Sequence, residues 1–269
     1  MLAHFSHYHH RCRLPRCITS FLEFTMTATD SAHFPHIHLL CMEEKFITAF
    51  RAARLSQRLP SSVSITIHHC SLEELPSSVQ FDTIVSPANS YGRLDGAFDD
   101  AISEAFAPRD DYHALTKVAQ TVLFHKYRGF APPGTCTLVR IPDDFLSRSR
   151  NIWGTRRVAL CPTMRMPSDA QWDREVVYEC IWTLLCAIDN HNRDVQDGIA
   201  AEGDGPIRSV LMTPIATGVG RVSPEKWATQ TVLAMKHFDQ ANETPEQWSS
   251  LGWADLGRSC VEVKRTWEK

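Results

Sequence analysis

The middle of the sequence reads Val85-Ser86-Pro87-Ala88-Asn89-Ser90-Tyr91-Gly92, where an apolar run gives way to a polar, glycine-containing segment. Residues 81–85, which end at the first residue of this stretch, form a short apolar run that predicts a buried strand. Residues 97–106 carry apolar side chains at helical spacing, which predicts an amphipathic helix. Residues 86–96 are therefore expected to form a loop that leaves a strand and enters a helix.

Strands and helices alternate on both sides of this unit. Further strands are predicted at residues 37–41, 63–67, 135–141, 158–163 and 210–212. Further helices are predicted at residues 43–57, 112–126 and 172–190, and from Pro224 onward with Ser223 as its N-cap. Residues 143–150 and 192–206 are polar and are predicted to be loops. This alternation is typical of an α/β domain with a largely parallel or mixed sheet.

Composition excludes several classes of function. The 269 residues are 43% hydrophobic and 22% charged, as in a globular protein, and the formal net charge of -3 predicts no duplex nucleic acid partner. No apolar run approaches the roughly 20 residues that span a bilayer, so we expect no membrane anchor. The nine cysteines are unevenly spaced and form no CxxC pair. We interpret them as reduced thiols, which indicates an intracellular protein, cytoplasmic or nuclear, with a mitochondrial location left open. We expect a monomer.

Three segments are expected along the chain. Residues 1–22 contain no acid, three arginines and four histidines. We read residues 1–30 as a disordered tail, or as upstream sequence if translation starts at Met26, and a transit peptide stays open. Residues 31–241 are expected to form the domain. Residues 242–269 carry Trp248, Trp253 and Trp267, which need burial, so this tail is expected to pack on the domain.

Two loops have the glycine content of an anion-binding site. They cover residues 86–96 and 213–223, and each joins a strand to a helix. Glycines let the backbone approach a phosphate, and free N–H groups at a helix start favour an anion. Neither loop matches a P-loop or GxGxxG, and about half of such turns are only structural. Asp95, Asp99 and Asp100 would repel a phosphate, so we expect them to point away from it, unless one faces a ribose.

These segments together resemble the macrodomain family, which binds ADP-ribose. Residues 81–90 resemble its D-x-I-V-N-A-A-N segment, and residues 95–102 look like its glycine-rich first loop with the following helix. Residues 213–220 resemble its second loop, P-x-x-x-T-G-V-G, and residues 161–167 are similar to a subgroup of fungi, bacteria and phages. The resemblance covers residues 63 to 240. It implies a three-layer α/β/α fold with a mixed central sheet.

The resemblance also implies roles for single residues. Asn89 would bind the distal ribose, and Asp99, with Asn89, would be catalytic, its carboxylate orienting water or a ribose hydroxyl. The implied ligand-binding residues are Ala88, Asn89, Gly92, Asp95, Gly96, Thr217, Gly218, Val219 and Gly220. The ligand would be ADP-ribose or a derivative, free or attached to a protein. The chain would then be a hydrolase of ADP-ribosyl linkages or ADP-ribose 1″-phosphate, a non-catalytic reader, or a ligand-free interaction module. No cofactor is implied.

The sequence also departs from the family pattern. Ser71 stands near the position of the aspartate that recognises adenine, so that contact is not implied here. Ser86 replaces the first asparagine of the motif, the glycine run is reduced to Gly96, and no Cys/His zinc ligands match, so we predict no metal. For two residues a purely structural role is an open alternative. Asn89 would serve as a turn residue bonded to its own loop, and Asp99 would stabilise the helix dipole.

Overall fold

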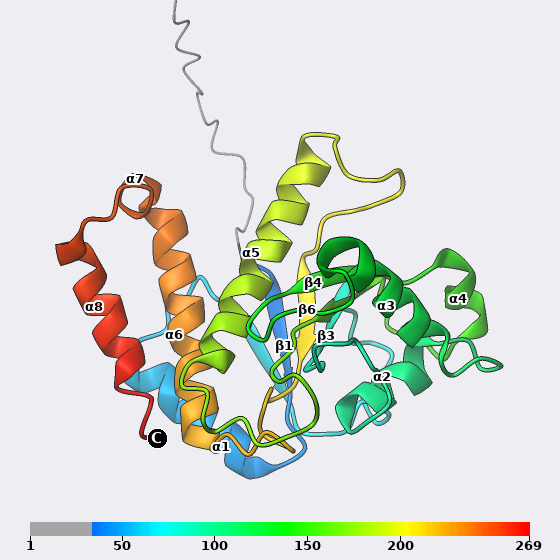
Figure 1. The fold of residues 1–269 in the computed structure, drawn as a ribbon, viewed down its shortest axis with the longest axis horizontal. Coiled ribbons are helices and arrows are strands. Elements are labelled where there is room, and N and C mark those ends of the chain that lie inside the picture. The colour runs from blue at the N-terminus through cyan, green and yellow to red at the C-terminus, as the bar shows by residue number, and fades with distance from the viewer. Residues whose placement is uncertain (1–33) are drawn as a thin grey trace, which may run out of the picture. The chain divides into compact units, whose positions relative to one another are not determined.

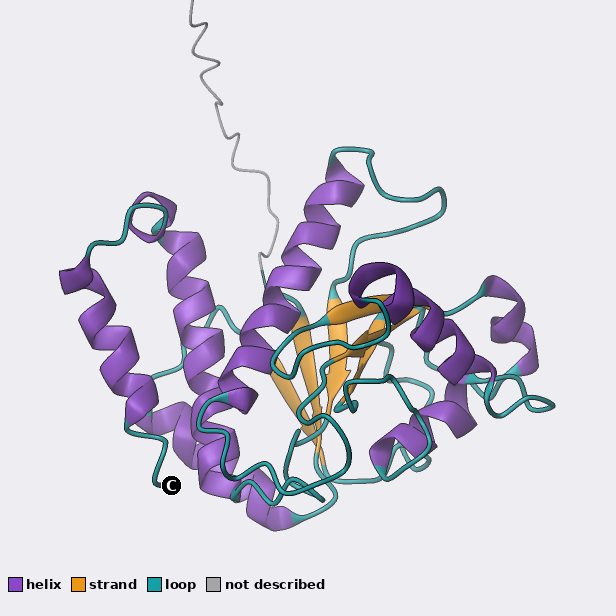
Figure 2. Cartoon of the chain, viewed as in Figure 1, coloured by secondary structure: helices purple, strands orange, loops and turns teal. Residues whose placement is uncertain are grey.

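A six-stranded sheet forms the middle layer of the structure, a computed structural model that describes residues 34–269 (Figures 1 and 2). The strands are β1 (His36–Leu40), β2 (Ile65–His68), β3 (Thr83–Ser86), β4 (Thr137–Arg140), β5 (Arg157–Leu160) and β6 (Ser209–Met212). Their order is β2-β1-β6-β3-β5-β4. All neighbours are parallel except β4 and β5, which are antiparallel. The predicted α/β fold with a mixed sheet is confirmed.

Helices cover both faces of this sheet (Figure 1). One face packs against α1 (Glu44–Ser56), α5 (Val176–Gln196) and α6 (Pro224–Glu243). The other packs against α2 (Phe98–Phe106) and α3 (Ala114–Tyr127). Consecutive strand residues serve opposite cores, because side chains alternate along a strand: Ile84 joins the second core and Val85 the first. The result is a three-layer α/β/α arrangement.

The strand order determines where loops meet. β3 lies between β6 and β5, and β6 lies between β1 and β3, all four strands running in the same direction. The carboxyl ends of these four strands therefore share one edge of the sheet. The loops after β3 and after β6, which are far apart in sequence, start side by side at that edge, where α/β folds bind ligands.

Several predicted boundaries are corrected by the structure. Residues 143–148 form α4 (Asp143–Arg148) instead of a loop, with Asp143 and Asp144 in the first turn, where acids favour the helix dipole. The helix predicted from Trp172 starts at Val176, and Trp172 is 73% exposed. It continues to Gln196, into the segment predicted to be a loop. The predicted N-cap is confirmed, since Ser223 Oγ accepts a hydrogen bond from Lys226 N at 3.1 Å.

The C-terminal residues form α7 (Pro245–Trp248) and α8 (Trp253–Lys264). Trp248 stacks on Trp182 of α5, and the Trp267 indole donates to Glu175 Oε1 at 2.7 Å. Trp253, in contrast, is 92% exposed, so the expected burial of all three tryptophans is wrong for this one. Between residues 34 and 269, no helix combines the length and apolarity that crossing a bilayer requires. The predictions for residues 1–30 lie outside the described residues.

Candidate functional site

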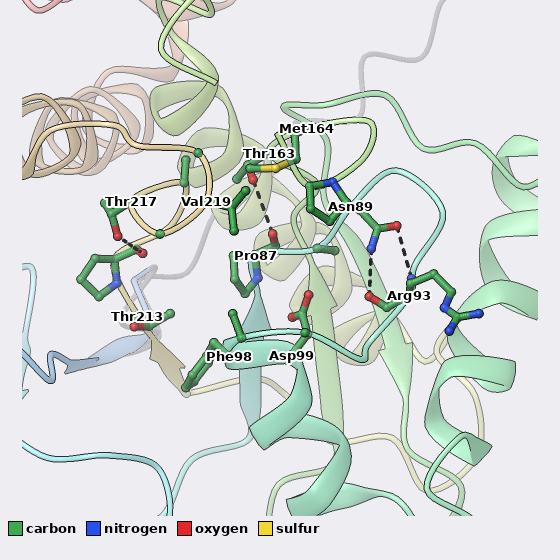
Figure 3. A pocket seen from close by; sticks show the side chains of 18 of the residues that line it. Pro87, Asn89, Arg93, Phe98, Asp99, Thr163, Met164, Thr213, Thr217 and Val219 are labelled. Atoms are coloured by element: carbon green, nitrogen blue, oxygen red, sulfur yellow. Dashed lines mark hydrogen bonds between the residues drawn. The ribbon is translucent and has the colours of Figure 1, made fainter. Parts of the chain in front are cut away.

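A cavity of about 370 Å³ lies at the carboxyl edge of the four parallel strands (Figure 3). Its volume is within the roughly 300–1,000 Å³ of small-molecule sites. Its walls come from the loops after β1, β3, β5 and β6 and from the start of α2. It therefore occupies the position at which the sheet topology favours a ligand.

The loop after β6 has the construction of an anion site. Thr217 Oγ1 donates to Pro214 O at 2.8 Å, and Val222 N donates to Ala216 O at 3.1 Å, so the turn is closed from within. Only glycine fits at position 220, because a Cβ there would collide with the Ala216 carbonyl oxygen. Within residues 34–269, the backbone N–H groups of residues 217–220 have no acceptor. All four of these residues line the cavity, and unpaired backbone donors of this kind suit an anionic ligand.

The start of α2 faces the same cavity. Ala97 adopts a left-handed φ of 53° and turns the chain into the helix, and Gly96, Ala97 and Phe98 all line the cavity. The N–H groups of a first helical turn have no partner inside the helix and carry its partial positive charge. Asp99 N donates to Gly96 O at 3.1 Å, whereas the N–H groups of Ala97 and Phe98 have no acceptor within residues 34–269. Gly96 itself has open space around it, so its small size is not required by packing. The site thus has backbone donors on two sides.

Asp99 faces the cavity. From the sequence, the acids of this helix are expected to point away from a phosphate unless one faces a ribose, and the Asp99 carboxyl is the one that points into the cavity (Figure 3). Asp99 is only 7% exposed, and Ser86 Oγ donates to its Oδ1 at 2.6 Å. Burial raises the pKa of Asp99 to about 7; the Ser86 bond lowers it and the Asp95 charge raises it. A large share of Asp99 is therefore neutral at neutral pH.

The other two acids are held outside the cavity floor. Asp95 lines the rim and forms an ion pair with Arg93, and the hydrogen bond from Arg93 holds its pKa below the usual range. Asp100 is exposed, does not line the cavity, and accepts a hydrogen bond from the Tyr112 hydroxyl. The expectation that acids point away holds for Asp100 only.

Asn89 is bonded mainly to its own loop. Its Oδ1 accepts from Tyr91 N at 3.0 Å. Its Oδ1 also accepts from Arg93 N at 3.4 Å, and its Nδ2 donates to Arg93 O at 2.9 Å (Figure 3). This is the turn role that the sequence left as an alternative. The residue nevertheless lines the cavity, beside Ala88, and one N–H of its amide has no partner among the described residues.

Two residues singled out in the sequence lie elsewhere. Gly92 does not line the cavity. It has a φ of 65°, and a Cβ there would lie 2.8 Å from Leu123 Cδ1, so backbone conformation and packing on α3 account for this glycine. Ser71 exchanges hydrogen bonds with Glu74 in an exposed turn after β2 and is also outside the cavity.

Some cavity residues were not named as ligand-binding from the sequence. They follow β1 or β5, or lie within or beside the two predicted loops: Met42, Glu43, Phe46, Thr163, Met164, Pro167, Pro87, Arg93, Ala97, Phe98, Thr213, Pro214 and Ala216. The sequence of residues 161–167 already shows a resemblance to a macrodomain subgroup, and for the residues after β1 the available signal is that they follow a predicted strand. Using it requires knowing that β1 and β5 flank β6 and β3, and strand order is not visible in a single sequence.

Comparison with known proteins gives likeness to solved structures alone. No protein-family model matches the sequence, and no match is found among curated proteins. A mutant of the Oceanobacillus iheyensis macrodomain is 18% identical, with 60% of this chain and 68% of that chain covered and a TM-score of 0.40. The macrodomain of the same organism with ADP is 18% identical over 58% and 70%, with a TM-score of 0.39. A different mutant of it, with ADPR, is 16% identical over 72% and 92%, with a TM-score of 0.43.

Proposed function

We propose that this protein binds ADP-ribose or a close derivative in the cavity at the carboxyl edge of the sheet. The observation that carries the proposal is the pair of backbone surfaces that line it. Residues 217–220 present unpaired N–H groups, and the start of α2 adds its own donors. Two such surfaces suit a diphosphate, because each phosphate accepts several hydrogen bonds without needing a cationic side chain.

The identity of the ligand rests on the sequence resemblance. The segments that resemble macrodomain motifs, residues 81–90, 95–102 and 213–220, contribute most of the cavity wall. In this proposal the diphosphate lies between residues 217–220 and α2, and a ribose lies toward Asn89 and Asp99. Phe46 and Phe98 supply apolar surface for the base.

Hydrolysis of an ADP-ribosyl linkage, or of ADP-ribose 1″-phosphate, is a second candidate function. Asp99 favours it, because a buried carboxyl with a pKa near neutrality is the group that proton transfer needs. The substrate would then include an ADP-ribosylated protein. A reader has the same cavity and no turnover, so activity and binding have to be measured separately.

We place the protein inside the cell as part of the same proposal. Seven cysteines are described, and all are free thiols. Cys41, Cys136, Cys161 and Cys180 are buried in the core, where they act as small apolar side chains. Reduced core thiols are typical of an intracellular protein.

Calorimetry and thermal unfolding with ADP-ribose, ADP-ribose 1″-phosphate, ADP and NAD test the binding proposal. At 100 times its Kd, ADP-ribose should stabilise the wild type by about 2.7 kcal/mol. Gly220→Ala should weaken binding about tenfold or more, because the loop must shift and lose charge-assisted hydrogen bonds of about 1.5–3 kcal/mol each.

The matched control is Gly257→Ala in α8, where an added Cβ meets no atom within 4 Å. It should bind like the wild type. The unfolding temperature of each ligand-free variant shows whether weaker binding comes from a change in the cavity or from a destabilised fold. No heat and no stabilisation with any of the four ligands would refute the proposal.

A further inference from the structure

The cavity contains an electrostatic conflict. Asp99 lies on its floor, within reach of the same space that the donors of residues 217–220 line. An ionised carboxylate there would repel a diphosphate. Arg93 is the one cationic side chain among the described residues that line the cavity, and its guanidinium is already bound to Asp95. Something other than a cation must therefore make Asp99 compatible with an anion.

Ser86 supplies a partner for one oxygen of Asp99. It is the last residue of β3 and is fully buried. Its carbonyl accepts from Cys161 N at 2.9 Å, so the backbone on which it stands is held by the neighbouring strand segment. Its hydroxyl bonds to Asp99 Oδ1 at 2.6 Å, while Oδ2 has no hydrogen-bond partner in residues 34–269. The pair thus leaves a single carboxyl oxygen for the cavity.

We propose that Ser86 is a positioning residue: it holds Oδ1 of Asp99, so that a proton on Oδ2 faces the cavity and Asp99 acts as a neutral hydrogen-bond donor to an anionic ligand. The inference rests on the proposed function for the nature of that ligand. It makes a specific prediction about charge. Asp99 attracts the diphosphate or a ribose oxygen in its protonated form and repels the diphosphate in its ionised form.

The surroundings of Asp99 support the neutral form. Asp95, on its own segment, is the charge that raises the pKa of Asp99. Asp100 lies on the same helical turn but outside the cavity, and Glu43 lines the cavity with its carboxylate paired to Lys45. The N-terminus of α2 favours ionisation, as does the Ser86 bond. Burial outweighs both and places the pKa at about 7. A bound anion raises that pKa further, so binding near or above neutral pH takes up a proton.

The ligand-free protein provides the first test. The ¹³C chemical shift of the Asp99 carboxyl, followed by NMR against pH, should report a titration near pH 7. Ser86→Ala should move this titration to higher pH, because it removes a hydrogen bond that favours the ionised form. An Asp99 that titrates near the ordinary aspartate pKa of about 4 would overturn the inference.

The second test is calorimetry with ADP-ribose between about pH 6 and about pH 9, in buffers of different ionisation enthalpy. The wild type should take up a proton, and its affinity should fall by up to about tenfold per pH unit above the pKa of Asp99. Asp99→Asn, which keeps a donor and cannot ionise, should bind with an affinity independent of pH. At about pH 6, Ser86→Ala should bind ADP-ribose about fivefold more weakly than the wild type, because the protonated Asp99 Oδ2 is no longer held in the orientation that donates to the ligand.

Asp100→Asn is the matched control, since it removes a carboxylate from the same helical turn but does not line the cavity. It should keep the proton uptake of the wild type. Affinity that does not change with pH, or proton uptake that persists in Asp99→Asn, would contradict the inference. Absence of ADP-ribose binding at every pH, with Asp99 still titrating near pH 7, would instead refute the proposed function alone.

Discussion

Asn89 and Asp99 are both polar residues of one loop-helix segment, and their surroundings give them different capacities. The Asn89 amide is bonded to its own loop through both its oxygen and its nitrogen, so its first role is to shape residues 89–93. Asp99 has one partner, Ser86, and is otherwise enclosed. A buried group with unused bonding capacity is the better candidate for chemistry, because its protonation state responds to what binds beside it.

Asp99→Ala tests that capacity at the scale of the residue. If the protein is a hydrolase, this variant should lose turnover of mono-ADP-ribosylated protein or ADP-ribose 1″-phosphate by about 100-fold or more, the usual contribution of a general acid or base. Binding of ADP-ribose should persist, weakened by the loss of the Asp99 donor, because the amides of residues 217–220 are unchanged. Product release and calorimetry are the two measurements.

A wild type that binds ADP-ribose and turns over none of these substrates would identify a reader instead. Loss of binding and turnover together in Asp99→Ala would mean that the carboxyl is needed for affinity. In that case the comparison with Asp99→Asn separates the missing donor from the missing acid.

At the scale of the element, α6 connects the ligand loop to the core. It begins immediately after residues 213–223, and 13 of its 20 residues are buried, with Trp227 at the centre of the packing against Phe46 and Phe50. Its N-terminus is held by the Ser223 cap. A helix so enclosed gives the preceding loop a rigid end, which is how a backbone anion site keeps its geometry.

Ser223→Ala should lower the free energy of unfolding by about 1 kcal/mol, the usual cost of removing an N-cap. Urea denaturation measures this change, and the slope of the transition should stay constant. Ser250→Ala serves as the control, since its hydroxyl donates to Glu246 O on an exposed turn. An equal decrease in the free energy of unfolding in both variants would show that the Ser223 cap contributes no more than an exposed turn hydroxyl.

At the scale of the whole molecule, buried and partly buried titratable groups give stability two opposing responses to acid. His38 Nδ1 lies 3.0 Å from His68 Nε2, and burial with the nearby His36 lowers the pKa of both, that of His38 to about 4. In acid the unfolded chain binds more protons at these histidines, so their contribution to stability is lost as pH falls from about 6.5 toward 4. Asp99 acts oppositely, because its raised pKa favours the folded protein as pH falls through 7.

His38→Gln should therefore flatten the loss of stability between about pH 6.5 and about pH 4. Asp99→Asn should gain stability relative to the wild type as pH rises through 7, since the wild type must ionise a buried carboxyl there. Urea midpoints across this range are the measurement. A wild-type profile that His38→Gln leaves unchanged would remove the histidine pair as the cause.

The strands, the long helices and the helix start at Ser223 could be predicted from the sequence alone. Apolar periodicity located the core of each strand and of the long helices, and Ser223 marked the start of α6, because these features depend on neighbours within one turn or one strand. The glycine-containing loops were found for the same reason. The boundaries that failed, at Trp172 and at residues 143–148, lie where short-range patterns are ambiguous.

The cavity was decided by the tertiary structure. The parallel direction of β1, β6, β3 and β5 brings the loops after these four strands to one edge, and their order makes the loops after β3 and β6 neighbours. Strand neighbours are not visible in a single sequence. The same holds for Asp99, for which the sequence left a catalytic role and a helix-dipole role open. Burial beside Ser86 gives it a pKa near neutrality, and burial depends on residues distant in sequence that close the space around it.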